Sequence, residues 1–88
     1  MVYLISYDLK KPGQDYTAVH EAIKSLGDWA KPLESLWFVD TNFTYEDVYD
    51  RVHAAMDTND NLLVMKASID YVGHFSTEVH NWLKSRLS

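Results

Sequence analysis

The chain has 88 residues, of which 47% are hydrophobic and 24% are charged, so we expect a single folded domain (residues 1–88). It contains no cysteine, which excludes disulfides, thiolate catalysis and zinc–thiolate sites. Thirteen acidic residues against eight basic ones give a formal charge of −5. Such a surface repels polyanions, so binding of nucleic acid would need a local basic patch or a bound cation.

The N-terminus lacks the features of an export signal. Its apolar run is short, has no basic residues before it and is closed by Asp8, so no signal peptide is expected. No stretch approaches the roughly 20 apolar residues that a membrane helix needs. We therefore expect a cytoplasmic protein with no membrane partner.

The first two predicted elements are a strand and a helix. Residues 2–8 are β-branched and aromatic, and both faces begin apolar, which is typical of a strand in the middle of a sheet. Residues 15–26 have an apolar stripe of helical period, and Gly27 follows where a left-handed C-terminal cap is expected.

Two short strands are expected next, at residues 29–33 and 36–40, joined by a tight turn or bulge near residues 34–35. Pro32 cannot donate a hydrogen bond to a neighbouring strand, which confines this segment to an edge strand or a bulge. The apolar run at residues 36–39 indicates a buried strand.

The second half of the chain repeats the pattern and adds a helix. Thr44 is a suitable N-cap for a helix with Val48 and Val52 on its apolar face, and residues 57–61 form a polar stop. Residues 62–68 are expected to form a core strand, and Ser76 to cap a last helix over about residues 76–87.

This order of elements predicts an α+β fold, the ferredoxin-like βαββαβ sandwich (core 1–68) with an extra C-terminal helix. The central strands would be residues 2–8 and 36–40. Both internal helices would cover one face of the sheet, leaving large apolar side chains on the other. Either a partner subunit or the C-terminal helix must bury that second face.

Acidic side chains end two of the expected strands. If the first and third strands are parallel neighbours, Asp8 and Asp40 lie at the same sheet edge, with Asn42 close behind. Carboxylate and amide oxygens are the ligands that Mg²⁺ or Mn²⁺ prefers, and such an ion could activate water for phosphodiester cleavage. The structural alternative is that Asp and Asn occupy strand ends because they start turns.

The four histidines do not form a recognisable site. No two are spaced three or four residues apart, so no helix presents a histidine pair. His20 falls opposite the apolar stripe of its helix and is expected at the surface or at the boundary of the core. His74 lies in a loop that could reach a site. The aromatic residues are expected in the core or in an interface.

Three segments resemble a known family. The opening strand Tyr3-Leu4-Ile5-Ser6-Tyr7-Asp8-Leu9, the segment Glu34-Ser35-Leu36-Trp37-Phe38, and the helix at residues 44–48 with the strand from residue 61 are similar to the small CRISPR-associated nuclease and integration-scaffold family. Lys11-Pro12-Gly13 resembles a loop of its stand-alone relatives. The virulence-associated protein D toxins share this general build.

The resemblance implies a ferredoxin-like homodimer in which the aspartate ending the first strand lies near the dimer axis. Two copies of Asp8 would hold one Mg²⁺ or Mn²⁺ for cleavage of RNA or DNA. The resemblance also places three residues near the substrate, Ser6, Tyr7 and Trp37. Three lysines remain near this end of the chain: Lys10, Lys11 and Lys31.

The sequence departs from the family in one respect. Active relatives commonly carry arginines at the start of the first helix and on the second strand, where this chain has Asp15–His20 and Trp29–Pro32. Lysine offers phosphate a point charge and not a bidentate fork. Two hypotheses follow: a homodimeric, metal-dependent nuclease-like protein, or a catalytically silent dimeric interaction or scaffold module.

Overall fold

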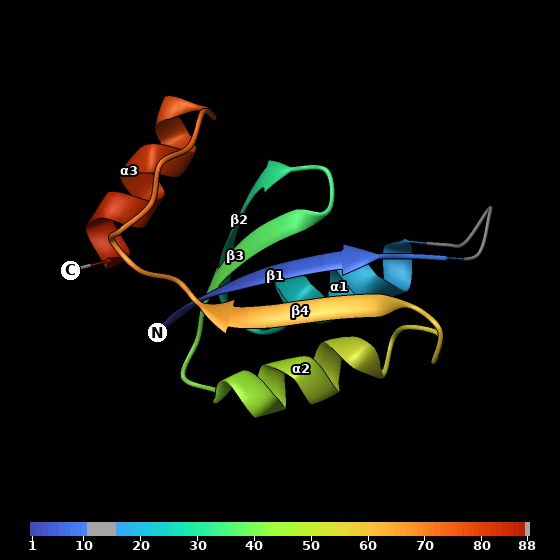
Figure 1. The fold of residues 1–88 in the computed structure, drawn as a ribbon. Coiled ribbons are helices and arrows are strands. Elements are labelled where there is room, and N and C mark those ends of the chain that lie inside the picture. Colours follow the sequence, from blue (N-terminus) through green and yellow to red (C-terminus); the bar gives the residue numbers. More distant parts are fainter. Residues whose placement is uncertain (11–15, 88) are drawn as a thin grey trace.

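The computed structural model describes residues 1–10 and 16–87, which form one four-stranded sheet and three helices (Figure 1). In chain order the elements are β1 (Val2–Asp8), α1 (Thr17–Lys24), β2 (Asp28–Leu33), β3 (Leu36–Asp40), α2 (Tyr45–His53), β4 (Asn61–Lys66) and α3 (Thr77–Arg86). The sheet order is β2-β3-β1-β4, with every neighbouring pair antiparallel. The predicted ferredoxin-like fold with a C-terminal helix is confirmed.

The core lies between the sheet and the helices α1 and α2. β1 and β3 are the central strands, as predicted, and alternate side chains of each point toward the helices. Trp37 is the largest fully buried side chain. The other members of the core are Tyr3, Ile5, Tyr7, Val19, Ile23, Leu26, Val39, Val48 and Val52.

Helix α1 is shorter than the predicted span, ending at Lys24 although Leu26 is still buried. The predicted role of Gly27 as a left-handed cap is wrong, because its φ of 159° is extended. Glycine is needed there for a different reason. A Cβ at this position would overlap the carbonyl oxygen of Asp40, where the start of β2 passes the end of β3.

The hairpin β2–β3 matches its prediction closely. β2 is an edge strand, and its register against β3 shifts between Ala30 and Leu33, the stretch that contains Pro32. Proline is tolerated there because an edge strand and a bulge do not require its missing N–H. β3 begins and ends at the predicted residues, Leu36 and Asp40.

Side chains cap the other two helices at the predicted positions. The hydroxyl oxygen of Thr44 accepts a hydrogen bond from the backbone N–H of Asp47 (3.2 Å) at the start of α2. That of Ser76 accepts one from the N–H of Val79 (3.3 Å) at the start of α3. These bonds satisfy N–H groups that have no partner within the helix.

β4 differs from the predicted core strand, because it lies at the sheet edge. Leu62 and Val64 pack against the core, while Leu63 and Met65 point to the opposite face and are 51% and 50% exposed. The apolar run therefore places apolar side chains on both faces of β4, although helices cover only one of these faces fully. The strand ends at Lys66, two residues before its predicted end.

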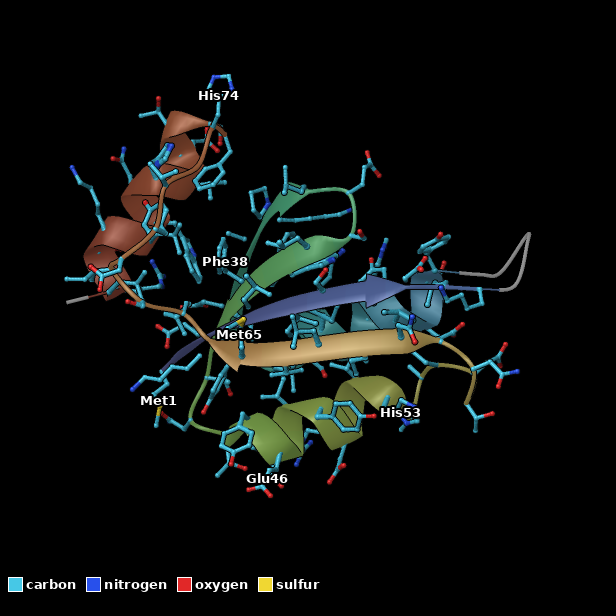
Figure 2. All side chains as sticks on the ribbon, viewed as in Figure 1. Met1, Phe38, Glu46, His53, Met65 and His74 are labelled. Carbon is cyan, nitrogen blue, oxygen red and sulfur yellow. The ribbon has the colours of Figure 1, made fainter. Side chains whose placement is uncertain are left out.

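Helix α3 covers part of the face opposite α1 and α2. Leu83 of α3 is fully buried, and Leu83 and Leu87 face Leu4, Phe38 and Met65 across a cavity of about 220 Å³. In Figure 2, Phe38 and Met65 lie on the α3 side of the sheet and His53 lies on α2. Within the described residues, no helix is long and apolar enough to cross a membrane.

Candidate functional site

The antiparallel sheet separates the two acidic residues that were expected to share a metal ion. Asp40 stands opposite Val2 at the start of β1, whereas Asp8 ends β1 and stands opposite Asn61. Six residues of strand at about 3.3 Å each place Asp8 roughly 20 Å from the Asp40 end of the sheet. The expectation of parallel neighbours was wrong, because the crossover makes β1 parallel to β2 and the hairpin then reverses β3.

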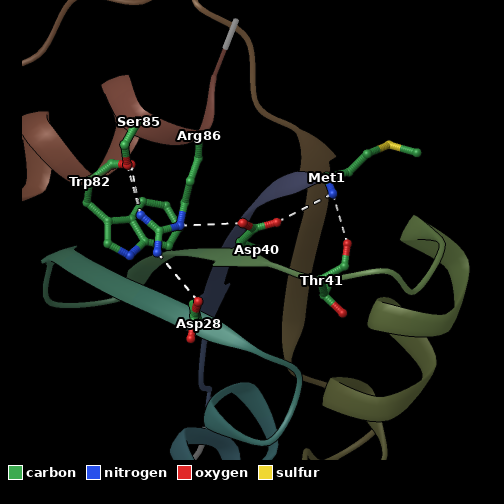
Figure 3. Close-up of polar contacts among 7 residues, drawn as sticks. All are labelled: Met1, Asp28, Asp40, Thr41, Trp82, Ser85 and Arg86. Carbon is green, nitrogen blue, oxygen red and sulfur yellow. Dashed lines mark hydrogen bonds and ion pairs between the residues drawn. The ribbon is translucent and has the colours of Figure 1, made fainter.

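Asp40 belongs to a structural corner of the molecule, shown in Figure 3. Its carboxylate lies 3.5 Å from the N-terminal ammonium of Met1 and 3.4 Å from Nε of Arg86. The same guanidinium reaches the carboxylate of Asp28 at 3.5 Å. Asn42 follows Asp40 and so lies at this end of the sheet too, away from Asp8. These contacts join the N-terminus, β2, β3 and α3.

Asp8 is open to solvent at the other end of the sheet. Its side chain is 65% exposed and accepts a hydrogen bond from Nζ of Lys10 at 2.6 Å. It shares a sheet face with Leu4 and Ser6, the face that α1 and α2 do not cover. Among the described residues, no group of three histidine, cysteine, aspartate or glutamate side chains could hold a metal ion.

Tyr7 and Trp37, expected near a substrate, meet on the helix-covered face. Nε1 of Trp37 donates to the hydroxyl oxygen of Tyr7 (3.4 Å), and that hydroxyl lies 3.1 Å from Nε2 of His20 on α1. An indole nitrogen can only donate, so the hydroxyl oxygen of Tyr7 accepts from Trp37, while the direction of its hydrogen bond with His20 follows the tautomer of the imidazole. The Tyr7 hydroxyl therefore links Trp37 on β3 to His20 on α1.

The surroundings of Tyr7 and His20, the two titratable side chains in this hydrogen-bonded group, favour their neutral forms. The pKa of His20 is lowered, mainly by burial and then by the charges of Lys31 and Lys24. The pKa of Tyr7 is raised, mainly by burial, against the lowering effect of the hydrogen bond from Trp37. Neutral groups suit a partly buried hydrogen-bond chain.

One further aromatic ring and two lysine side chains connect this hydrogen-bonded group to the protein surface. The ring of Trp29 lies 5.1 Å from that of Trp37, with Nζ of Lys24 5.2 Å above Trp29 and Nζ of Lys31 5.4 Å above Trp37. Trp29 is 42% exposed. Of the residues predicted near the substrate, the structure thus brings together Tyr7, Lys31 and Trp37.

The remaining predicted residues lie elsewhere. Ser6 is on the opposite face, paired with Leu36 and Leu63, and Lys10 is beside Asp8. Lys11 lies outside the described residues. His20 is partly buried, within the predicted surface or boundary position, but sequence reasoning missed its contact with Tyr7. The spacing of Tyr16, His20 and Lys24, four residues apart, places them along one side of α1 and was the signal available.

An apolar surface remains on the uncovered face beyond α3. We call it the open sheet patch: the half-exposed Leu33 (52%), Leu63 (51%) and Met65 (50%), with the partly buried Ser6 and Leu36 between them. Asp8 borders this patch at the end of β1. Contiguous exposed apolar side chains of this kind are typical of interaction surfaces.

Comparisons with known proteins support the fold. No family model matches the chain, and no curated protein matches its sequence. A solved structure described as a hypothetical protein, TT1823, from Thermus thermophilus is similar, with a TM-score of 0.58 over 85% of this chain and 93% of that one. The two sequences are 18% identical, so this similarity establishes the architecture alone.

Proposed function

We propose that this chain acts as a homodimer joined through the open sheet patch, and that the dimer is a divalent-metal-dependent nuclease-like protein. Support for the dimer comes from Leu33, Leu63 and Met65, each about half exposed on one sheet face. Leaving such side chains in water forgoes roughly 25 cal/mol for every Å² of apolar surface that a partner would bury. A second copy offers the same apolar face and is the simplest complement.

The observation that carries the catalytic part is the position of Asp8. Its exposed carboxylate borders the open sheet patch on the same face, so a two-fold axis near the end of β1 would bring two copies of it together. The oxygens of two carboxylates suit Mg²⁺ or Mn²⁺. Such an ion would supply an activated water molecule and neutralise phosphate charge. The sequence resemblance to metal-dependent nucleases supports the same role for Asp8.

Other residues would act around this carboxylate. Ser6 lies on the same face two residues before Asp8, where its hydroxyl could contact a bound phosphate. Lys10 would exchange its carboxylate partner for the phosphate when a cation binds Asp8. Tyr7 and Trp37 are buried on the other face, so their role would be to position the end of β1 and not to contact substrate.

The test is cleavage of RNA and of DNA, single-stranded and duplex, with Mg²⁺ or Mn²⁺. We expect metal-dependent cleavage by the parent chain and at least a hundredfold loss in Asp8→Asn, because a neutral amide is a poor ligand for a hard cation. Asp50→Asn, which alters an exposed carboxylate on α2, is the matched control. Sedimentation should show a dimer that Leu63→Glu weakens. Failure of the parent to cut either nucleic acid, or equal cleavage by Asp8→Asn, would remove the catalytic claim.

A second candidate function is a catalytically silent dimeric interaction or scaffold module. It is favoured by the 2.6 Å contact of Lys10 with Asp8, which already neutralises the expected ligand, and by the net charge of −5. This candidate predicts the same dimer without Mn²⁺ binding by calorimetry. It also predicts that an immobilised chain retains a protein and no nucleic acid at low salt.

A further inference from the structure

We propose that α3 is an intramolecular cap that competes with the second copy for the uncovered sheet face. This inference rests on the proposed homodimer and concerns how its assembly is controlled. The first observation is that α3 and the open sheet patch lie on the same face. Met65 belongs to both, since it lines the cavity beneath α3 and is half exposed in the patch. A second copy seated on the patch would therefore meet α3.

The patch by itself is large enough only for a weak dimer. Strands about 4.8 Å apart, rising about 3.3 Å per residue, give the whole four-stranded face dimensions of roughly 20 Å by 20 Å. A stable interface typically buries about 800 Å² on each partner. The part that α3 leaves open is only a fraction of this face. A tighter dimer must also use the surface beneath α3, on the face that carries the buried Val2 and Ala30.

The attachment of α3 to the sheet is suited to release. Its apolar contact centres on Leu83, and a cavity of about 220 Å³ remains between Leu83 and Phe38. The segment that connects β4 to α3 adds little, since Ile69 and Val72 in it are exposed. Such incomplete packing forgoes the contacts that hold a helix firmly in place.

The second attachment is an ionic latch made by Arg86, drawn in Figure 3. Its guanidinium reaches Asp28 at 3.5 Å and Asp40 at 3.4 Å, and its Nε makes no hydrogen bond despite being buried. The Asp28 side chain is 76% exposed, whereas those of Asp40 and Arg86 are 37% and 26% exposed. The pair with Asp28 is therefore weak and screened by salt, and the more shielded pair with Asp40 is the stronger half of the latch. None of the three residues belongs to the main core cluster, so the latch can open without disturbing it.

The experiment measures the dimer dissociation constant of the full chain by sedimentation. Arg86→Ala should tighten the dimer roughly two- to fivefold, the range expected from losing one exposed and one partly shielded ion pair. Leu83→Asp should tighten it by more than about tenfold, because a charge cannot remain buried against the sheet. Leu83 lies outside the main core cluster, so this variant should keep its fold, which circular dichroism checks. Lys84→Ala removes one positive charge, as Arg86→Ala does, but from the exposed side of α3. It should change the dimer dissociation constant little.

A second measurement follows the cap directly. Amide hydrogen exchange in α3 should speed up in Arg86→Ala while exchange in β1 stays slow. The inference is overturned if Arg86→Ala and Leu83→Asp leave the dimer unchanged or weaken it, since α3 would then be irrelevant to the interface or part of it. If the parent nevertheless dimerises and Leu63→Glu disrupts that dimer, the proposal that α3 is a cap is refuted and the proposed homodimer stands. If no variant dimerises at any concentration, the proposed homodimer itself is wrong.

Discussion

The hydroxyl of Tyr7 joins three elements through two hydrogen bonds. It accepts from Trp37 on β3 and is hydrogen-bonded to His20 on α1, so its loss would leave a buried indole N–H without a partner. A buried donor left unpaired costs about 1–3 kcal/mol. Burial and the charges of Lys31 and Lys24 lower the pKa of His20, so protonation of this imidazole is disfavoured in the folded chain. The protonation state of His20, which was predicted at the surface or at the boundary of the core, therefore matters to the packing of α1.

Stability should fall as the pH is lowered through the histidine range. The pKa of His20 is lowered in the folded chain, so the unfolded chain binds this proton more tightly. Above pH 6.5 the imidazole is neutral in both states; as the pH drops below 6.5, proton uptake favours unfolding. Urea unfolding at several pH values between 7.5 and 5.5 should show a declining free energy of unfolding. His20→Gln should flatten this decline.

A matched control separates this effect from general acid sensitivity. His74→Gln alters an exposed histidine before α3 and should leave the decline as it is in the parent chain. If His20→Gln loses stability with the same slope as the parent, the burial of His20 does not couple folding to pH.

At the scale of elements, the start of β2 depends on a close approach between two backbones. Gly27→Ala should destabilise the fold by at least about 2 kcal/mol, because the added methyl group would overlap the carbonyl oxygen of Asp40 and the backbone must move. Gly73→Ala is the control, since its nearest contacts would be with the side chain of Phe75, which can shift more readily than a backbone carbonyl. Thermal unfolding of both variants checks the difference. Equal losses would show that the β2–β3 approach is not tight.

Local chemistry explains which elements could be predicted from the sequence. Thr44 and Ser76 carry the capping hydroxyl on their own side chains. Pro32 lacks a backbone N–H whatever surrounds it. These features can therefore be predicted without knowledge of distant residues. β3 was predicted to the residue because a short apolar run lies between a turn and an acidic end. Each of these signals is contained within a few positions of the chain.

Features that depend on distant segments were harder to predict. The end of the sheet at which Asp40 lies depends on the direction of β3, which the crossover and the hairpin determine together. His20 seemed exposed on a helical wheel, yet Tyr7 and Trp37 meet it from the sheet. Gly27 was identified as special, but its reason lies in Asp40, thirteen positions away. In each case the sequence identified the residue, but not the distant segment that the residue contacts.

For the whole molecule, charge and apolar surface act against each other. Each copy carries a formal charge of −5, so in the proposed homodimer two copies would repel while the open sheet patch would draw them together. At low ionic strength the repulsion extends over tens of ångströms, and at about 0.5 M salt it is confined to a few. The strength of self-association should therefore depend on salt, and the sign of that dependence identifies the forces involved.

Raising the salt concentration from 50 to 500 mM should tighten the dimer severalfold, because screening removes repulsion and leaves the apolar contact intact. A complex with nucleic acid would weaken over the same range, since phosphate contacts release counterions. The double variant Glu46→Gln/Asp50→Asn, whose changes lie on the exposed side of α2, should dimerise more tightly at 50 mM and show a flatter salt response. Sedimentation at the two salt concentrations measures both. A dimer that loosens with salt would be held by ion pairs, and the open sheet patch would then not be its interface.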